Sequence, residues 1–373
     1  MNNEIRVGVV GVLRGLSFAQ NAALSGMKLV AICDNWKEKL FSVDVGEEVA
    51  RYTDYNEFLS NEMDAVILAN YFHEHAPFAI KALKAGKHVM SETSCNFTLA
   101  EGVELCEAVE ETGLIYMLAE NYPYTKFNQE LRRLYQSGEI GKVSYAEGEY
   151  NHPMSEEELR QIIPDSEHWR AKLPPEYYCT HALAPLVYIT NLMPLTVVGF
   201  SVDLAEPTYP CPLGEKGFAA LIKMEEGAVF RIMGVCMPGH SNWYRIHGTK
   251  GAAETARGPG YFGPGQVRVW HESWARSEKT PIERVYEPDW HSNAELAEKV
   301  GHGGGDYWVE YNFAKSIRTG IQPFLDVYRG VTMSSVGILI HRSIKSGGMP
   351  QEIPDFMDKA ARERFRNDHQ RGF

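Results

Sequence analysis

Two side chains that can exchange protons lie three residues apart near the middle of the chain. Tyr178 and His181 precede an apolar stretch that runs to Leu192. If this turn is helical, both side chains project on neighbouring faces at the amino-terminal end of a helix. That end favours a tyrosinate and disfavours an imidazolium, so His181 is expected to be a neutral base. Packing combined with helix capping is the alternative interpretation of the pair.

Two carboxylates lie on a predicted strand upstream of this pair. Glu147 and Glu149 share one face of the strand, whereas Tyr150 and His152 have the opposite parity unless a bulge intervenes. Glu149 could protonate a leaving group if burial raises its pKa. A solvated strand face is the alternative interpretation.

A glycine-rich segment, Gly303–Gly305, lies between His302 and the pair Asp306 and Tyr307. The pattern predicts a flexible loop that ends in the N-cap of a helix. The rings of His302 and Tyr307 would then lie near the mouth of a pocket and could close over a substrate.

Four residues have the chemistry of zinc or manganese ligands: Glu149, His152, His181 and His302. Their spacing forms no compact ligand motif. We therefore expect no bound metal.

The first predicted strand leads into a glycine-rich turn of the kind that binds a dinucleotide. Gly8, Gly11 and Gly15 lie around the turn, and Leu13 and Arg14 stand where a helix begins. A helix N-terminus presents free N–H groups to a pyrophosphate. The spacing departs from G-x-G-x-x-G, because Leu13 replaces the second glycine. A tight turn that binds nothing is the alternative interpretation.

Asp34 ends the second predicted strand, at the distance from Gly11 that is typical of a ribose-binding carboxylate. Such a carboxylate accepts hydrogen bonds from both ribose hydroxyls and repels a 2′-phosphate. No arginine follows it, because the next residues are Asn35 and Trp36. We therefore expect NAD(H) rather than NADP(H) as the cofactor. Asp34 could also be a helix N-cap, and the two roles are compatible.

The elements that must position these groups fall into two domains. Over the first 120 residues, buried strands alternate with helices, as in a doubly wound α/β domain. The predicted strands are 5–10, 28–33, 64–69, 87–91 and 114–118, and the clearest helices are 76–84 and 99–111. Longer, alternating strands from about residue 142 predict an open antiparallel sheet with one covered face. We predict a cofactor domain over residues 1–121 and an α+β domain over residues 122–373.

The composition excludes several classes of protein. The chain has 373 residues and a formal net charge of −12, with 37 basic and 49 acidic side chains. This acidity argues against nucleic acid and anionic membranes as partners. The six cysteines show no C-x-x-C spacing, and the amino terminus shows no secretory core. We expect reduced thiols and a cytoplasmic location.

Several segments resemble the glucose–fructose oxidoreductase/inositol dehydrogenase (Gfo/Idh/MocA) family over nearly the whole chain. The most specific are 82–89 and 137–141, and segments 6–15, 29–34 and 64–75 also match. The resemblance implies an N-terminal Rossmann domain and a C-terminal α+β domain with a large, mostly antiparallel open sheet. It implies NAD(P), a sugar or polyol substrate, and homodimers or homotetramers. It also implies cofactor contacts from Asn70, His75, Glu92 and Asn121.

One departure from the family changes the expected chemistry. The dehydrogenases carry Glu-Lys-Pro after the fifth strand, whereas this chain has Glu92, Thr93 and Ser94. A threonine hydroxyl cannot act as a base near neutral pH. Lysine-free members include NAD-dependent glycosidases such as bacterial α-N-acetylgalactosaminidase. Segments similar to that branch are 119–122, 147–152, 178–185 and 301–307.

The resemblance to this branch implies roles for individual residues. The positions that match catalytic or sugar-contacting residues are Glu149, Tyr178, His181 and Tyr307, and further substrate contacts are expected from His152, Trp169, His302 and Asp306. The implied reaction is a glycoside hydrolysis through oxidation at sugar C3, proton loss at C2, elimination, water addition and re-reduction. We assign His181 to the C3 hydroxyl and Tyr178 to C2–H. A sugar or polyol dehydrogenase with net hydride transfer, or a catalytically silent sugar or NAD sensor, are the alternatives.

Overall fold

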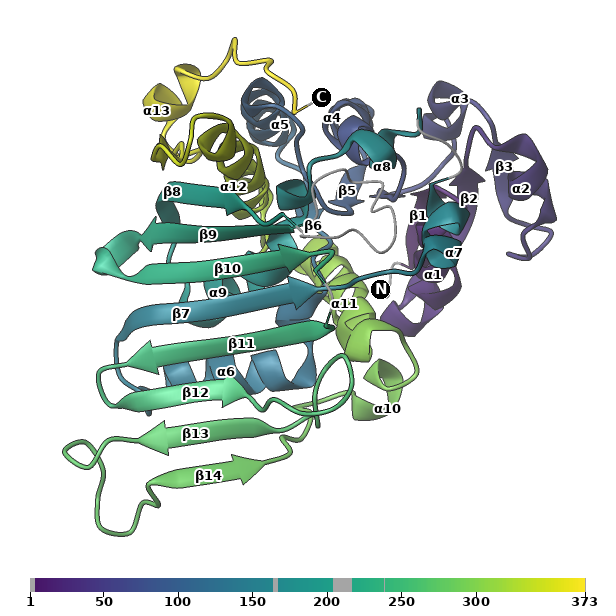
Figure 1. Ribbon diagram of the computed structural model, residues 1–373. Coiled ribbons are helices and arrows are strands. Elements are labelled where there is room, and N and C mark those ends of the chain that lie inside the picture. Colours follow the sequence, from purple (N-terminus) through teal and green to yellow (C-terminus); the bar gives the residue numbers. More distant parts are fainter. Residues whose placement is uncertain (1–3, 164–166, 204–216, 238, 373) are drawn as a thin grey trace. The chain divides into compact units, whose positions relative to one another are not determined.

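The computed structural model describes residues 4–163, 167–203, 217–237 and 239–372, and these form two compact units (Figure 1). The first unit runs to Asn121 and also includes Asn293–Val331 and Phe356–Gln370. The second unit comprises Tyr122–Ser292, Thr332–Asp355 and the last residues of the chain.

The first unit is built on a parallel sheet of six strands in the order β3-β2-β1-β4-β5-β6. The strands are β1 (Ile5–Val10), β2 (Met27–Cys33), β3 (Ala50–Tyr52), β4 (Ala65–Leu68), β5 (His88–Ser91) and β6 (Tyr116–Leu118). The strand order reverses at β1 and β4, so the carboxyl edge there has the crevice in which doubly wound folds bind their ligands. The five predicted strands are confirmed. The sequence pattern missed β3, because three half-buried residues form no apolar run.

Helices of the first unit follow the strands. They are α1 (Arg14–Asn21), α2 (Lys37–Ser42), α3 (Tyr55–Leu59), α4 (His75–Lys84), α5 (Leu99–Thr112), α10 (Ala294–Ala297), α11 (Gly305–Thr319) and α13 (Lys359–Glu363), with 3-10 turns η1 (Ala22–Ser25), η2 (Phe72–Glu74) and η6 (His302–Gly304). Helix α5 begins with a capping box between Thr98 and Glu101 and ends at Gly113 in a left-handed conformation.

The first unit draws in late segments of the chain that we predicted to lie in the second domain. Arg318 on α11 donates a hydrogen bond of 2.7 Å to the carbonyl of Gly26. Gly102 on α5 packs against Val331 and Phe356. The predicted boundary at residue 121 coincides with the observed one, but residues 293–331 and 356–370 pack with the cofactor domain.

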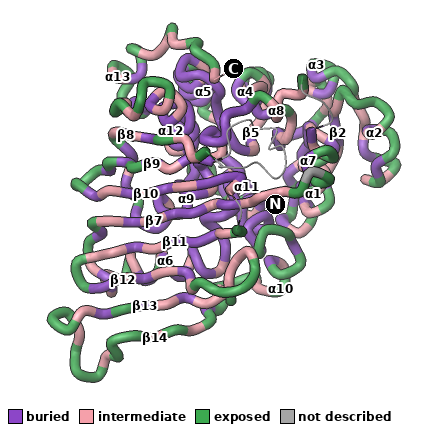
Figure 2. Tube along the Cα trace, viewed as in Figure 1, coloured by how far each residue is buried: buried purple, intermediate pink, exposed green. Residues whose placement is uncertain are grey.

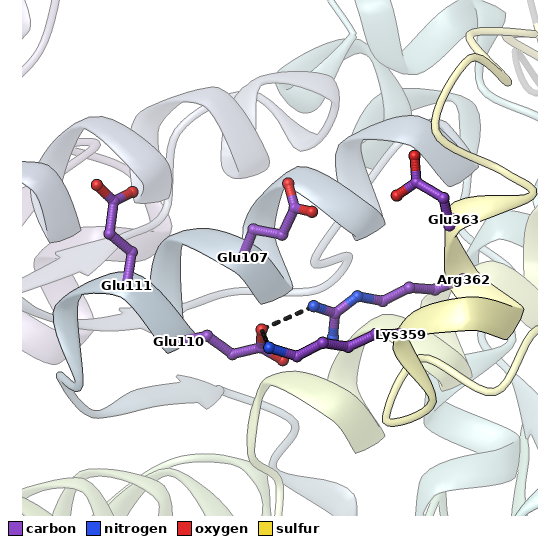
Figure 3. A pocket seen from close by; sticks show the side chains of 6 residues that line it. All are labelled: Glu107, Glu110, Glu111, Lys359, Arg362 and Glu363. Carbon is purple, nitrogen blue, oxygen red and sulfur yellow. Dashed lines mark hydrogen bonds and ion pairs between the residues drawn. The ribbon is translucent and has the colours of Figure 1, made fainter.

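Ion pairs fasten the C-terminal segment to α5 within the first unit (Figure 3). The Arg362 guanidinium donates hydrogen bonds of 2.7 and 2.8 Å to the two carboxylate oxygens of Glu110. Lys359 lies 3.0 Å from the same carboxylate. The hollow between α5 and α13 is therefore lined by four glutamates and two cations, and the ion pairs among them join the C-terminal segment to α5.

The second unit is a nine-stranded sheet in the order β14-β13-β12-β11-β7-β10-β9-β8-β15. Its strands are β7 (Val143–Asn151), β8 (Pro194–Ser201), β9 (Gly217–Met224), β10 (Val229–Val235), β11 (Ser241–Gly248), β12 (Gly251–Thr255), β13 (Val267–His271), β14 (Glu283–Tyr286) and β15 (Gln351–Glu352). All pairs are antiparallel except β7 with β10. The mixed, mostly antiparallel sheet confirms the predicted fold class.

Helices α6 (Lys126–Gln136), α9 (Thr180–Thr190) and α12 (Val327–Lys345) pack on one face of this second sheet. The unit also contains α7 (Glu156–Ile162) and α8 (Trp169–Lys172), with 3-10 turns η3 (Tyr122–Tyr124), η4 (Pro175–Tyr178) and η5 (Glu225–Gly227). In Figure 1, α6 and α9 lie behind the sheet and its front is open. A Cβ on Gly148 would lie 2.1 Å from the carbonyl oxygen of Ala182, so α9 packs on β7 at backbone distance.

The open face is divided between charged and apolar side chains. Figure 2 shows half-buried and exposed residues alternating with buried ones along the strands. Phe200 on β8 and Leu221 on β9 are 59% and 52% exposed. They alternate with Gly199 and Ile222, which are buried on the covered side.

Candidate functional site

The glycine-rich turn after β1 has the geometry that a bound dinucleotide requires. Gly11 has a φ of +98°, and a Cβ there would lie 2.3 Å from the carbonyl oxygen of Ala69 at the end of β4. A Cβ on Gly15 would meet Val9 at 3.0 Å, so this glycine lets α1 pack closely on the strand. Gly8 is different, because it lies inside β1 beneath Phe58 and Met63. The absence of a side chain at Gly8 therefore serves core packing, and its cofactor contact stays a prediction.

Asp34 lies at the carboxyl end of β2 and organises the same turn. Its two carboxylate oxygens accept hydrogen bonds of 2.8 Å from the backbone N–H groups of Val12 and Trp36. The capping role and the position expected for a ribose partner are thus combined in one side chain. Leu13 is 59% exposed at the start of α1, where the backbone N–H groups of the first helical turn are available to an anion.

The end of β4 carries a polar side chain that lacks a partner within the described structure. Both side-chain amide atoms of Asn70 are buried and make no hydrogen bond. Such orphaned groups mark a place for a ligand. His75, in contrast, is buried with Nδ1 2.9 Å from the carbonyl oxygen of Ser94 and Nε2 3.3 Å from that of Asn70. Burial lowers the pKa of His75, and its two ring nitrogens contact the backbone of the adjoining loops, so its cofactor contact stays a prediction.

Arg14 joins two carboxylates at this edge of the sheet. Its Nε donates to Glu92 at 2.8 Å, and its two terminal nitrogens donate to both oxygens of Asp306 at 2.9 and 2.7 Å. Burial alone would lower the pKa of Arg14, but Glu92 and Asp306 raise it above its ordinary value. Arg14 and Glu92, both predicted to contact the cofactor, therefore form an ion pair with each other.

Asp306 is the centre of this network. Besides Arg14, it accepts hydrogen bonds from Asn121 at 2.9 Å and from His302 Nδ1 at 2.8 Å. Burial raises the pKa of its carboxyl, but the hydrogen bonds from His302 and Arg14 outweigh burial and lower it well below its usual range. Asp306 is 2% exposed and engaged with Arg14, Asn121 and His302, and its contact with a sugar stays a prediction.

Two neighbours on α11 are also buried. Tyr307 is 2% exposed, and its ring contacts those of Trp308 and Tyr311. These are the surroundings of a core tyrosine, and its catalytic role remains a prediction. Glu310 is fully buried, and neither of its carboxylate oxygens has a hydrogen-bond partner in the described structure. Burial raises the pKa of Glu310 well above its ordinary value, which favours the protonated form of this carboxyl.

In the second unit, His181 lies among tyrosine rings. The predicted helical turn is confirmed, because Tyr178 ends η4 and His181 is the second residue of α9. The centroid of the His181 ring lies 4.4 Å from that of Tyr150, 4.8 Å from that of Tyr122 and 5.9 Å from that of Tyr178. Burial raises the pKa of Tyr122 and of Tyr150, which keeps both phenols neutral.

Tyr178 is hydrogen-bonded to a cationic side chain. Arg170 on α8 donates a hydrogen bond of 2.6 Å to its hydroxyl oxygen. The guanidinium also lies 4.7 Å from the centroid of Trp169, so the ring predicted to stack on a sugar is covered by Arg170. A hydrogen bond from a charged donor at this distance is of the strong, charge-assisted kind.

Sequence reasoning missed Arg170 as a functional residue, along with Tyr261, His240 and Tyr122. The hydroxyls of Tyr122 and Tyr261 lie 3.1 Å apart, and His152 has its ring against those of His240 and Tyr261. Burial lowers the pKa of His152. The available signal was an aromatic residue, Tyr261, inside a glycine-rich stretch that otherwise indicated only a loop.

Glu149 does not fit the predicted role of leaving-group acid. Arg231 and Arg257 each donate to one of its carboxylate oxygens at 3.0 Å, and Ser241 donates to the other at 2.6 Å. Burial raises the pKa of Glu149, but the bonds from Ser241 and the two arginines lower it overall, so the raised pKa that an acid needs is not met. Strand alternation also places Glu149 on the open face of the sheet, opposite Tyr150.

Three further observations concern possible ligands. Within residues 4–163, 167–203, 217–237 and 239–372, no group of three or more His, Cys, Asp or Glu side chains is arranged to hold a metal ion. Among the same residues, no helix is long and apolar enough to cross a membrane. The five described cysteines are free and buried, and Cys211 lies outside the described residues.

Three family models match consecutive parts of the chain. The model described as "Oxidoreductase family, NAD-binding Rossmann fold" matches residues 5–120, and "GFO/IDH/MocA C-terminal domain" matches residues 128–254. The model "Glycosyl hydrolase 109, C-terminal domain" matches residues 221–362. The first unit is therefore an NAD-binding Rossmann domain.

Known proteins agree with these matches. The chain is 28% identical to glycosyl hydrolase family 109 protein 1 of Akkermansia muciniphila, over 95% of this chain and 82% of that protein. It is 25% identical to a glycosyl hydrolase family 109 protein of Solibacter usitatus, over 95% and 89% of the two chains. Among solved structures, levoglucosan dehydrogenase with NADH and levoglucosan aligns with a TM-score of 0.78 at 19% identity, covering 94% of this chain and 100% of that one. Myo-inositol 2-dehydrogenase from Lactobacillus plantarum aligns with a TM-score of 0.70 at 17% identity, over 94% and 100% of the chains, and these two structures share the fold.

Proposed function

The chain belongs to the Gfo/Idh/MocA family of NAD-dependent enzymes, and we propose that it is a glycoside hydrolase that works by transient oxidation of its sugar. The observation that carries the proposal is the 2.6 Å hydrogen bond from Arg170 to the hydroxyl of Tyr178. A plain dehydrogenase needs a base for a hydroxyl proton, whereas elimination across C1–C2 needs a second base for a carbon-bound proton. A stabilised tyrosinate supplies that second base.

The first unit provides the groups that would hold NAD. The turn at Gly11, the N-terminus of α1, the Asp34 carboxylate and the orphaned Asn70 amide all lie at the carboxyl edge of its sheet. Bound NAD would accept a hydride from the sugar and return it. Because Asp34 would repel a 2′-phosphate, a measured preference for NADP(H) would contradict this assignment.

Tyr178 is proposed to remove the C2 proton. It ends η4 and is separated from α9 by the N-cap Cys179, and the N-terminus of α9 adds a partial positive charge to that of the Arg170 guanidinium. Both effects favour the phenolate. The proton passes from C2 to the Tyr178 oxygen, and the pair of electrons left on C2 forms the C1–C2 double bond as the bond from C1 to the leaving group breaks.

His181 is proposed to take the proton of the C3 hydroxyl. Its backbone is fixed because the Tyr244 hydroxyl donates 2.7 Å to the carbonyl of His181. The neutral rings of Tyr122 and Tyr150 lie around it. Thr93 takes the place of the lysine that serves this purpose in the dehydrogenases, so His181 is the base that remains in the described motif.

A panel of nitrophenyl glycosides tests the function directly. The purified enzyme is expected to retain NAD and to release nitrophenol with no net accumulation of NADH. Product formed in D2O should carry deuterium at C2. Cleavage without deuterium at C2, or full activity after NAD is stripped, would contradict the mechanism. Stoichiometric NADH production from an intact glycoside would establish the net dehydrogenase instead.

We further propose that the chain pairs through the open face of the second sheet. Phe200 and Leu221 on neighbouring strands are both more than half exposed, and apolar surface of this kind is typically covered by a partner. A homodimer or homotetramer is expected at micromolar concentration. Sedimentation that detects only a monomer would refute the pairing, and Leu221→Asp should dissociate it if the face is correctly chosen.

A further inference from the structure

A late segment of the chain is fastened across the carboxyl edge of the cofactor sheet. Asp306 lies 292 positions after Arg14 in the sequence, yet the two side chains form a bidentate pair within the first unit. We call the set formed by Arg14, Glu92, Asn121 and Asp306 the latch. All four residues lie outside the strands, so their contacts are not part of the hydrogen bonding of the sheet.

The backbone before Asp306 is shaped to reach this position. His302, Gly303 and Gly304 have φ values of 54°, 60° and 84°, a left-handed run that carries the chain over a short distance. A Cβ on Gly305 would lie 2.4 Å from the carbonyl oxygen of Asn121. The start of α11 therefore packs at backbone distance on the segment that follows β6.

The latch also connects the start of α11 to the segments that follow β1 and β5. Arg14 begins α1, after the turn that follows β1, and Glu92 follows β5, whereas Asn121 lies beyond β6. One carboxylate, Asp306, accepts from both Arg14 and Asn121, and Arg14 also donates to Glu92. Asp306 has a side chain that is 3% exposed, so water does not screen these bonds strongly.

We propose that the Arg14–Asp306 pair sets how slowly NAD leaves its site. A dinucleotide in a doubly wound fold lies outside the carboxyl ends of the strands, next to the turn that Arg14 begins. A segment fastened across the same edge must loosen before the cofactor can leave. Arg14 and Asp306 are positioning residues in this role and take no part in the chemistry. The proposal depends on NAD binding and is independent of whether the enzyme is a glycosidase.

The measurement is the release rate of NADH in the absence of any sugar. The protein is loaded with NADH, mixed with excess NAD+, and followed by the fluorescence of bound NADH. Asp306→Asn keeps the shape of the side chain but removes its charge. Arg14→Lys keeps the charge but cannot form the bidentate pair. Each variant is expected to release NADH about ten- to a hundredfold faster than the unaltered enzyme, as expected for loss of a charge-assisted pair.

A matched control separates the latch from general destabilisation. Glu110→Gln breaks another arginine–carboxylate pair in the same unit, the one with Arg362. It is expected to leave the release rate within about twofold of the unaltered value, the size that weakly coupled sites show. The proposal is overturned if Arg14→Lys and Asp306→Asn release NADH at the unaltered rate, or if Glu110→Gln accelerates release as much as they do. Should Asp306→Asn fail to fold, Arg14→Lys alone decides, because it retains the charge.

Discussion

The two groups of reactive side chains are held in place by different forces. In the first unit, a buried carboxylate binds an arginine and its neighbours through charge-assisted hydrogen bonds. In the second unit, His181 is held among aromatic rings, and one cation, Arg170, contacts Tyr178. Charge pairs do not tolerate the loss of one partner, whereas packed rings tolerate changes that keep their volume. Substitutions that change a charge should therefore have the larger effect in the cofactor-binding unit. In the proposed catalytic group, substitutions that remove a single oxygen atom should have the larger effect.

The largest effect is expected from Tyr178→Phe, which keeps the ring and removes one oxygen. Loss of a general base typically lowers a rate by about 10² to 10⁴. Glycoside cleavage and incorporation of deuterium at C2 should fall together, while NAD content stays unchanged. The measurements are nitrophenol release and mass spectrometry of the product formed in D2O.

Tyr188→Phe is the matched control for this substitution. Tyr188 lies on α9, and the guanidinium of Arg132 on α6 lies 4.1 Å from its ring centroid, so this tyrosine also has a cationic neighbour. Its loss of a hydroxyl should leave both rates close to the unaltered values. Equal losses in the two variants would show that the aromatic packing of α9, rather than the Tyr178 oxygen, is responsible.

Arg170→Met should have the next largest effect, because it removes the charge that stabilises the Tyr178 phenolate. A hydrogen bond from a charged group is worth about 1.5–3 kcal/mol, so activity near neutral pH should fall about ten- to a hundredfold. Part of the loss should return as the pH is raised, since a higher pH ionises the phenol without help. The pH dependence of nitrophenol release measures this.

Arg132→Met removes the comparable cation over Tyr188 and serves as the control. It should reduce activity little and leave the pH dependence of nitrophenol release unchanged. A uniform loss at every pH in Arg170→Met would assign that residue to packing on Trp169 instead of to the Tyr178 oxygen.

Most of the first unit could be predicted from its sequence, because its parallel strands are nearly continuous apolar runs. β4, for example, consists of four fully buried residues, Ala65–Leu68. The late segments could not be placed in this unit, because their attachment depends on a pair of charges 292 positions apart. Nothing in the local pattern around Asp306 distinguishes an N-cap from the partner of a distant arginine.

The second site shows a similar limit. The turn that carries Tyr178 and His181 could be predicted, since an apolar helix follows it directly. Glu149 was misjudged because the sequence shows that a carboxylate lies on a strand, but not that two arginines and a serine lie around it. Its neighbours come from other strands, and only the observed register brings them together.

A substitution of the buried Glu310 on α11 is expected to have a smaller effect than those at Tyr178 and Arg170, and to change stability and not rate. Burial raises the pKa of Glu310, so its contribution to the free energy of unfolding is full below its unfolded value and is lost as the pH rises through the folded one. Glu310→Gln should match the unaltered protein near pH 4 and be the more stable of the two near pH 8. Urea unfolding at the two pH values tests this, with Glu295→Gln on the exposed face of α10 as the control. Equal stability at pH 8 would mean that Glu310 is ionised in the folded protein.

The smallest effect is expected at Glu110, which is more exposed than Glu310. Hydrogen bonds from Arg362 lower the pKa of Glu110 to about 2. A depressed carboxyl pKa stabilises the fold above the unfolded value, and that stability disappears as the pH falls towards 2. Glu110 is 22% exposed while Arg362 is 3% exposed, and a glutamine amide oxygen can still accept a hydrogen bond from Arg362, so Glu110→Gln should cost about 1–2 kcal/mol at pH 7. Glu111→Gln is the control, since its carboxylate stands away from Arg362 and Lys359 in Figure 3. The difference between the two variants in urea unfolding should shrink steadily between pH 5 and pH 2, and a difference that persists undiminished at pH 2 would attribute the effect to packing and not to charge.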